Sequence, residues 1–231
     1  MNALQVDDLR FEVRRSARRK SLEITVDRGG ELVLAAPPEV DEATLRAFVQ
    51  EKRFWIYTRL AEKEQLQKTA PPKTFVNGEG FLYLGRSYRL KLVDGQAEPI
   101  KLLNGRFCLR RELADTGCQA LIRWYTEKGK DWLWRKVRDY VARMEVAPAG
   151  VKVRDLGYRW GSCGKDGWLY FHWKAILLPA RIAEYVVVHE LAHLHEPHHT
   201  PEFWRRVERA LADFEHRKRW LAEHGMEVEG L

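Results

Sequence analysis

The chain has 231 residues, of which 45% are hydrophobic and 32% charged. Nine Trp, nine Phe and eight Tyr residues supply material for a sizeable core, which excludes a disordered, collagen-like or coiled-coil protein. The net charge of +7 allows weak attraction to phosphate polymers or acidic surfaces, although interspersed charges of both signs are also typical of an ordinary solvated surface.

Residues 10–36 are predicted to form paired strands. Apolar and polar residues alternate in Phe11–Arg14 and Leu22–Val26, and Asp27–Gly30 supplies a hairpin turn before Glu31–Leu34. The amino-terminal part is therefore expected to be rich in strands.

A dense basic cluster lies between the first two of these strands. It consists of Arg14, Arg15, Arg18, Arg19 and Lys20. The cluster could bind nucleic acid, but a solvated loop is the more common structure for such a run.

A helix is predicted from Asp41 toward Lys68, because its apolar residues recur at helical spacing. A linker at Thr69–Lys73 separates this helix from three short β candidates. These are Phe81–Leu84, Tyr88–Val93 and Phe107–Arg110. A second helical pattern runs from about Thr116 to Met144.

The pattern changes from strands to helices near residues 112–118. This change predicts two parts, a strand-rich part at 1–115 with one long helix and a helical part at 116–231. The fold class that follows is α+β, with the strand-rich part packed on the helical part.

A helix of about four turns is predicted after Pro179, and it contains the motif His189-Glu190-x-x-His193. Residues four apart project from one face of a helix, so both imidazoles can bind one Zn²⁺. Glu190 is then placed to take a proton from water at the metal. Two buried imidazoles beside a carboxylate are costly unless something binds them, which makes a purely structural role improbable.

A catalytic zinc ion needs a third protein ligand. The nearby candidates are His195, His198, His199, Glu202 and Glu208. Pro197 disfavours a helical Glu196, so the helix is expected to end near His195 and the chain to turn back toward the metal. Thr200 and Pro201 are typical of a new helix start.

We select His199 as the third ligand, because zinc peptidases whose helix breaks before the third histidine use the same spacing. One group of those proteases has Gly in the break where this chain has Glu196, so membership of that group is not supported. His195 lies two residues after His193, on the wrong face of the helix. His198 and the two carboxylates remain alternatives.

Two further strands are predicted just upstream, at Arg159–Cys163 and Gly167–Lys174. An exposed edge there could hold an extended peptide by strand addition. Arg159 could stabilise an oxyanion or hold the strand by an ion pair, and Cys163 could approach the metal or be an ordinary buried thiol.

Four motifs in this order resemble the YgjP-like metallopeptidase family, which is related to the SprT-like and WLM zinc peptidases. They are Arg159–Cys163, Leu169–Trp173, Tyr185–Leu194 and His198–Trp204. The amino-terminal strands and the helix containing Phe54–Ile56 are also similar to that family, so the resemblance covers most of the chain.

The resemblance implies a zincin-like metallopeptidase part with a short antiparallel sheet. It also implies one zinc ion with His189, His193 and His199 as ligands, and Glu190 as catalytic base. The family usually has Asn where this chain has His198 and His172.

The predicted function is zinc-dependent hydrolysis of peptide bonds in peptide or protein substrates. A nucleic-acid-associated protein that uses the basic cluster, and a hydrolase of non-peptide amides, are the alternatives. No apolar run approaches the ~20 residues of a membrane helix. The three cysteines form no Cys-x-x-Cys pair. We therefore expect a soluble cytoplasmic protein without membrane contact.

Overall fold

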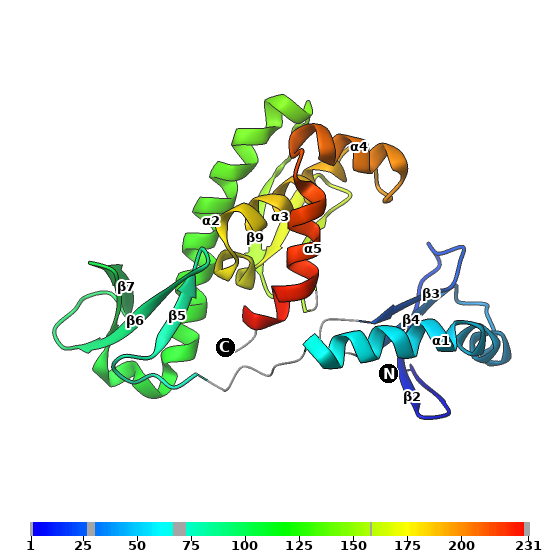
Figure 1. Ribbon diagram of the computed structural model, residues 1–231, viewed down its shortest axis with the longest axis horizontal. Helices are drawn as coiled ribbons and strands as arrows, with labels where there is room; N and C mark the ends of the chain where they lie inside the picture. Colours follow the sequence, from blue (N-terminus) through cyan, green and yellow to red (C-terminus); the bar gives the residue numbers. More distant parts are fainter. Residues whose placement is uncertain (1, 27–30, 67–72, 158, 229–231) are drawn as a thin grey trace. The chain divides into compact units, whose positions relative to one another are not determined.

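A computed structural model describes residues 2–26, 31–66, 73–157 and 159–228 (Figure 1). Contacts divide the chain into two compact units, Met1–Lys68 and Thr69–Leu231, and each unit has its own hydrophobic core. The described residues form three small sheets and five α-helices, which confirms the α+β class. None of the described helices is both long and apolar enough to cross a membrane.

The first unit is a four-stranded sheet with one long helix. Its elements are β1 (Asn2–Val6), β2 (Leu9–Arg15), β3 (Glu23–Val26), β4 (Leu32–Ala36) and α1 (Glu42–Leu66). The sheet order is β1-β2-β4-β3, with β2 and β4 parallel and the outer pairs antiparallel. Strand β1 is not predicted from the sequence. The expected turn at residues 27–30 and the linker at 69–72 lie outside the described residues.

Helix α1 begins where the sequence predicts. The side chain of Asp41 accepts a hydrogen bond from the backbone N–H of Thr44 at 2.7 Å, which satisfies one of the free donors of the first turn. Leu45, Val49 and Ile56 are buried against the strand residues Phe11 and Leu34. The core of this unit therefore forms between the sheet and one apolar face of α1.

The second unit begins with another four-stranded sheet. Its strands are β5 (Gly80–Tyr83), β6 (Arg86–Val93), β7 (Ile100–Leu103) and β8 (Arg106–Arg110), in the order β5-β6-β8-β7. Three of them match the predicted strands, and β7 is additional. One face packs on the next helix, where Phe107 contacts Trp124 and Tyr125 through edge-on ring contacts.

The contacts place the division of the chain at 68/69, whereas the pattern change lies near residue 115. Residues 73–110 belong to the second unit because their apolar side chains share one core cluster with the helices that follow. A change of secondary-structure type along the chain does not by itself mark the border of a core.

The long helix α2 (Gly117–Met144) follows a short 3₁₀ turn, η1 (Arg111–Thr116), and confirms the second predicted helix. After it come the strands β9 (Gly150–Arg154), β10 (Gly161–Cys163) and β11 (Trp168–His172), in the order β10-β11-β9. The β10–β11 pair is antiparallel as expected, and β9 adds a parallel strand on the other side.

The remaining elements are a second 3₁₀ turn, three helices and a final 3₁₀ turn. They are η2 (Trp173–Leu177), α3 (Ala180–Ala192), α4 (Pro201–Ala210), α5 (Phe214–His224) and η3 (Gly225–Val228). Helix α3 lies between α2 and α5 (Figure 1). It is buried on nearly all sides, as its almost continuously apolar sequence requires.

The β5–β6 hairpin tip holds the start of α3. The backbone N–H groups of Leu84 and Gly85 donate to the carbonyls of Ile176 and Leu177, at 2.8 and 3.1 Å. Gly85 has a φ of +77°, and a Cβ there would lie 2.7 Å from the Cα of Pro179, just before the helix. Only glycine fits both the backbone conformation and this close approach.

We expect Gly85→Ala to destabilise the fold more than Gly105→Ala does. Both positions have a positive φ, which costs an alanine roughly 1–2 kcal/mol, but a Cβ at Gly105 meets nothing within 4 Å. The contact with Pro179 should add a further ~1–3 kcal/mol of overpacking at Gly85. Urea unfolding of both variants measures the difference, and equal losses would contradict this account.

Candidate metal centre

The carboxyl-terminal end of α3 carries the motif found in the sequence. The helix is apolar and deeply buried before it reaches His189, and Glu190 itself is only 5% exposed. His189 and His193 lie one helical turn apart, and their ring centroids are 5.0 Å from each other. The fold therefore places both imidazoles on the same face, as the spacing predicts.

The α-helix ends earlier than expected, at Ala192 instead of near His195. Tight turn bonds continue the chain, because the N–H groups of Leu194 and His195 donate to the carbonyls of Leu191 and Ala192, both at 3.1 Å. Such tightening is common at the last turn of a helix. The chain then leaves the helix direction before Pro197, so the break itself is confirmed.

Helix α4 begins as the sequence indicates. The Thr200 side chain accepts a hydrogen bond from the Phe203 N–H at 3.3 Å, and Pro201 occupies the first turn. Two fixed helix ends thus hold the connecting turn, and the turn returns His199 to the end of α3.

His189, His193 and His199 form one cluster. Each offers a ring nitrogen, and these three nitrogens lie within 4.8 Å of one another. The ring centroid of His199 is 4.9 Å from that of His189 and 4.8 Å from that of His193. Among the described residues, this is the group of three or more potential ligands that could hold a metal ion.

The hydrogen bonds indicate which nitrogens face the shared point. The Nε2 atoms of His189 and His199 are 3.0 Å apart, while Nδ1 of His193 lies 3.0 Å from the carbonyl oxygen of Glu196. If His193 donates to that carbonyl, its Nε2 lone pair is free for a metal. The buried Nδ1 of His189 has no hydrogen-bond partner among the residues that the structure describes. Three imidazoles in this arrangement suit a cation with nitrogen ligands.

Burial keeps the three rings neutral. It lowers the pKa of His189 to about 3, with smaller contributions from His193 and His199. Burial also lowers the pKa of His193 and of His199. Neutral imidazole is the form that binds a metal, so the site is prepared for one over the whole neutral range of pH.

Two aromatic side chains, Phe203 and Trp204, pack against the histidine cluster. The Phe203 ring is fully buried, and its centroid lies 4.6–4.9 Å from those of the three histidines. Trp204 stacks on His199 at 5.6 Å, and the Lys218 ammonium lies 4.0 Å from the Trp204 ring centroid. Neither aromatic residue is assigned to the metal site from the sequence.

Glu190 is buried next to the cluster. Burial raises its pKa to about 8, and the positive charge of Arg159 acts in the opposite direction. Gly161 in β10 packs against this carboxyl group so closely that a Cβ there would lie 2.6 Å from the Glu190 Cγ and Oε1. The strand backbone thus forms one wall of the Glu190 site, which the sequence analysis missed.

Residues 20–224 match the family model described as YgjP-like, metallopeptidase domain. The chain belongs to the YgjP-like metallopeptidase family. It is also similar to the crystal structure of the metallopeptidase zymogen of Pyrococcus abyssi abylysin, with 22% sequence identity, 39% of this chain and 92% of that chain covered, and a TM-score of 0.36. No curated protein matches the chain.

The other candidate ligands of this YgjP-like chain lie outside the cluster. His195 Nε2 lies 3.2 Å from the carbonyl oxygen of Met144, and Glu202 pairs with Arg205. His198 and Glu208 are exposed, and neither belongs to the group of potential ligands.

Two residues singled out upstream have structural contacts of their own. Cys163 donates its thiol hydrogen to the Gly164 carbonyl at 3.6 Å, and burial raises its pKa to about 11, so it is a thiol instead of a thiolate. Nδ1 of His172 accepts a hydrogen bond from the Lys174 N–H at 3.0 Å, and its Nε2 lies 3.3 Å from an oxygen of Asp155. Buried His172 therefore caps η2.

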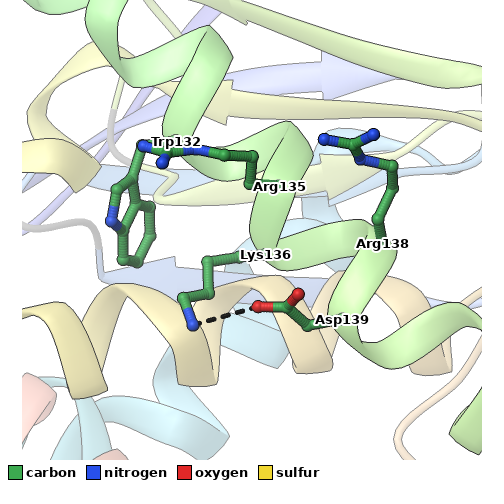
Figure 2. A pocket seen from close by; sticks show the side chains of 5 residues that line it. All are labelled: Trp132, Arg135, Lys136, Arg138 and Asp139. Atoms are coloured by element: carbon green, nitrogen blue, oxygen red, sulfur yellow. Dashed lines mark hydrogen bonds and ion pairs between the residues drawn. The ribbon is translucent and has the colours of Figure 1, made fainter.

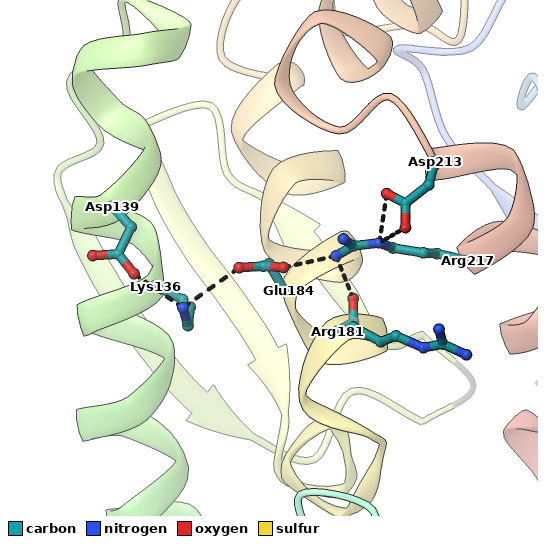
Figure 3. A network of polar contacts seen from close by, with 6 residues as sticks. All are labelled: Lys136, Asp139, Arg181, Glu184, Asp213 and Arg217. Carbon is teal, nitrogen blue, oxygen red and sulfur yellow. Dashed lines mark hydrogen bonds and ion pairs between the residues drawn. The ribbon is translucent and has the colours of Figure 1, made fainter.

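A polar network holds α3 between its neighbours (Figure 3). The Glu184 carboxylate pairs with Lys136 of α2 at 3.4 Å and with Arg217 of α5 at 2.7 Å. Arg217 also donates to the Arg181 carbonyl at 2.8 Å and pairs with Asp213. These partly buried contacts hold the helix one to two turns before the histidines.

We expect the cost of Gly161→Ala to depend on Glu190. In the native background the added Cβ should lower the free energy of unfolding by ~1–3 kcal/mol, because it overlaps the Glu190 side chain. In a Glu190→Ala background the overlapping atoms are absent, so most of that loss should disappear. A double-mutant cycle by urea unfolding measures the coupling. The same loss in both backgrounds would contradict the contact.

Proposed function

We propose that this chain is a zinc-dependent peptidase with His189, His193 and His199 as metal ligands and Glu190 as general base. The observation that carries the proposal is the convergence of three neutral imidazole nitrogens within 4.8 Å beside a buried carboxyl group. Membership of a metallopeptidase family supports the reaction class. Three nitrogen ligands with room for a fourth are typical of catalytic zinc.

Zinc, when bound, would act as a Lewis acid on the scissile carbonyl and make water a nucleophile at neutral pH. Glu190 would accept the proton of the attacking water and deliver it to the leaving amine. Its carboxylate form is required for the first step. The Arg159 charge favours that form, and a divalent cation close by would favour it further.

Strand β10 supports a proposal for how the substrate is held. It lies at the edge of the three-stranded sheet and packs on α3, and Gly161 within it contacts Glu190. An extended peptide that pairs with this edge would lie beside the proposed base and the histidines. We therefore propose peptides or unfolded protein segments as substrates.

All residues with proposed chemical roles lie within 116–231, which we propose as the catalytic part. All three cysteines are free, which fits the proposed location in the reducing cytoplasm.

We expect His199→Ala to lose stoichiometric zinc and His198→Ala to retain it. His199 belongs to the histidine cluster, whereas His198 lies outside it. Loss of a direct ligand should weaken zinc binding by more than the 10–100-fold typical of losing an outer partner. Metal analysis of the purified proteins and zinc titration give the readout. Retention by His199→Ala with loss by His198→Ala would reverse the assignment.

We expect Glu190→Gln to retain zinc but to lower the rate of casein cleavage by roughly 10²–10⁴-fold, the usual contribution of a general base. Glutamine has nearly the same shape, so the buried site should stay intact. The assay follows fluorescent peptides released from labelled casein, with His198→Ala as the matched control. Undiminished cleavage by Glu190→Gln would exclude the base role.

A further inference from the structure

The excess positive charge of the chain is confined to one segment. Residues 73–144 contain 15 Lys and Arg residues and 8 Asp and Glu residues, whereas the rest of the chain contains 25 of each kind. This segment forms the β5–β8 sheet and helix α2, and it contains none of the residues of the candidate metal centre. The charge excess therefore lies in a part of the chain that does not supply the proposed metal ligands.

The β5–β8 sheet has two different faces. Successive residues of a strand point to opposite faces, so the buried Phe81, Leu90 and Phe107 pack toward α2. The residues of the opposite, outer face include five cations and no carboxylate. The cations are Arg89, Lys91, Lys101, Arg106 and Arg110. Two of them have ion-pair partners outside the strands, since Lys101 pairs with Glu98 at 3.3 Å and Arg110 pairs with Glu112.

Two of these cations stand directly side by side. Arg89 on β6 pairs in register with Arg106 on β8, and Lys91 lies two residues further along the same face. Neighbouring like charges on paired strands destabilise a sheet. Among the described residues, neither Arg106 nor Lys91 has an ion-pair partner, and Arg89 donates only to the Gly78 carbonyl, at 2.7 Å. A bound anion would remove this repulsion.

A surface hollow of about 590 Å³ lies at these residues. Its charged lining consists of Arg89, Lys91, Arg106 and Arg111, and none of the described residues that line it is a carboxylate. Arg111 pairs with Asp94 at 3.1 Å. Leu90 and Leu92 belong to the opposite face, so they offer mainly backbone here. The hollow is therefore lined by cationic side chains and by backbone. Its described lining residues form no apolar pocket for a peptide side chain.

We propose that the outer face of the β5–β8 sheet binds the phosphate backbone of nucleic acid. Guanidinium groups match phosphate oxygens in pairs, and recognition through charge without apolar pockets is typical of backbone contacts. The site is separate from the metal centre, and the proposal does not depend on the proposed peptidase activity.

Two other basic surfaces are weaker candidates. In the cluster Arg14–Lys20, Arg14 pairs with Glu12 and Arg19 with Glu23, while Arg15 donates to backbone carbonyls at Pro37, Pro38 and Val40. The hollow on α2 shown in Figure 2 includes Asp139, and Lys136 there pairs with Asp139 and Glu184. Both surfaces are partly neutralised from within the chain, as Lys101, Arg110 and Arg111 are at the sheet. The sheet face differs because Arg89, Lys91 and Arg106 stand together and have no ion-pair partner among the described residues.

The test compares two full-length variants that each lose three positive charges. One carries Arg89→Gln, Lys91→Gln and Arg106→Gln on the sheet face, and the other carries Arg14→Gln, Arg18→Gln and Lys20→Gln in the amino-terminal cluster. Fluorescence anisotropy of a labelled DNA duplex gives the affinity across a range of salt concentrations. Circular dichroism and thermal melting establish that each variant is folded, and Arg106→Gln alone serves if the triple variant is not.

We expect the native chain to bind with an affinity that falls linearly with salt on logarithmic axes. The sheet-face variant should bind about tenfold or more weakly, with a slope smaller by roughly 0.9 per lost phosphate contact. The amino-terminal variant should stay close to native. No binding at low salt, or equal weakening in both variants, would overturn the proposal. Stronger binding of polyglutamate than of DNA by the same face would identify an acidic protein partner instead.

Discussion

The candidate site depends on three neutral imidazole rings that are held with their ring nitrogens close together. Three imidazoles meet at the end of α3, and the Nε2 atoms of His189 and His199 are 3.0 Å apart. Neutral rings in this position cannot satisfy one another fully, and charged rings would repel. In the proposed function, a divalent cation bound by these ring nitrogens would resolve the conflict. The packing around the site must then hold the three imidazole rings in positions where their ring nitrogens face one another.

Contacts from several neighbouring elements hold the three histidines in these positions. The Glu184 network ties α3 to α2 and α5, the capped start of α4 returns His199, and Phe203 supports all three rings from below. The hairpin tip at Gly85 holds the other end of α3. Because Gly161 closes one side of the Glu190 site, the edge strand, the carboxyl group and the metal ligands form one connected arrangement.

The second unit places its chemistry and its charge on different surfaces. The metal ligands come from α3 and the turn before α4, whereas Arg89, Lys91 and Arg106 lie on the outer face of the β5–β8 sheet. Both regions share one hydrophobic core through α2. A ligand held on the sheet would therefore be attached to the same compact body as the site that we propose to hydrolyse peptides.

The sequence by itself determined the histidine motif, the helix break at Pro197, the Thr200 cap and the α+β class, because each depends on local spacing and backbone chemistry. It also indicated His199, and the turn between two fixed helix ends brings this ring to the cluster. Only the tertiary structure decided the contact of Gly161 with Glu190, the roles of His195 and His172, and the pairing of β7 with β8 and of β9 with β11. These depend on which distant segments pack together. A glycine in the sequence does not show which distant side chain will pack against it. Short strands such as β7 become recognisable only through the strands with which they pair.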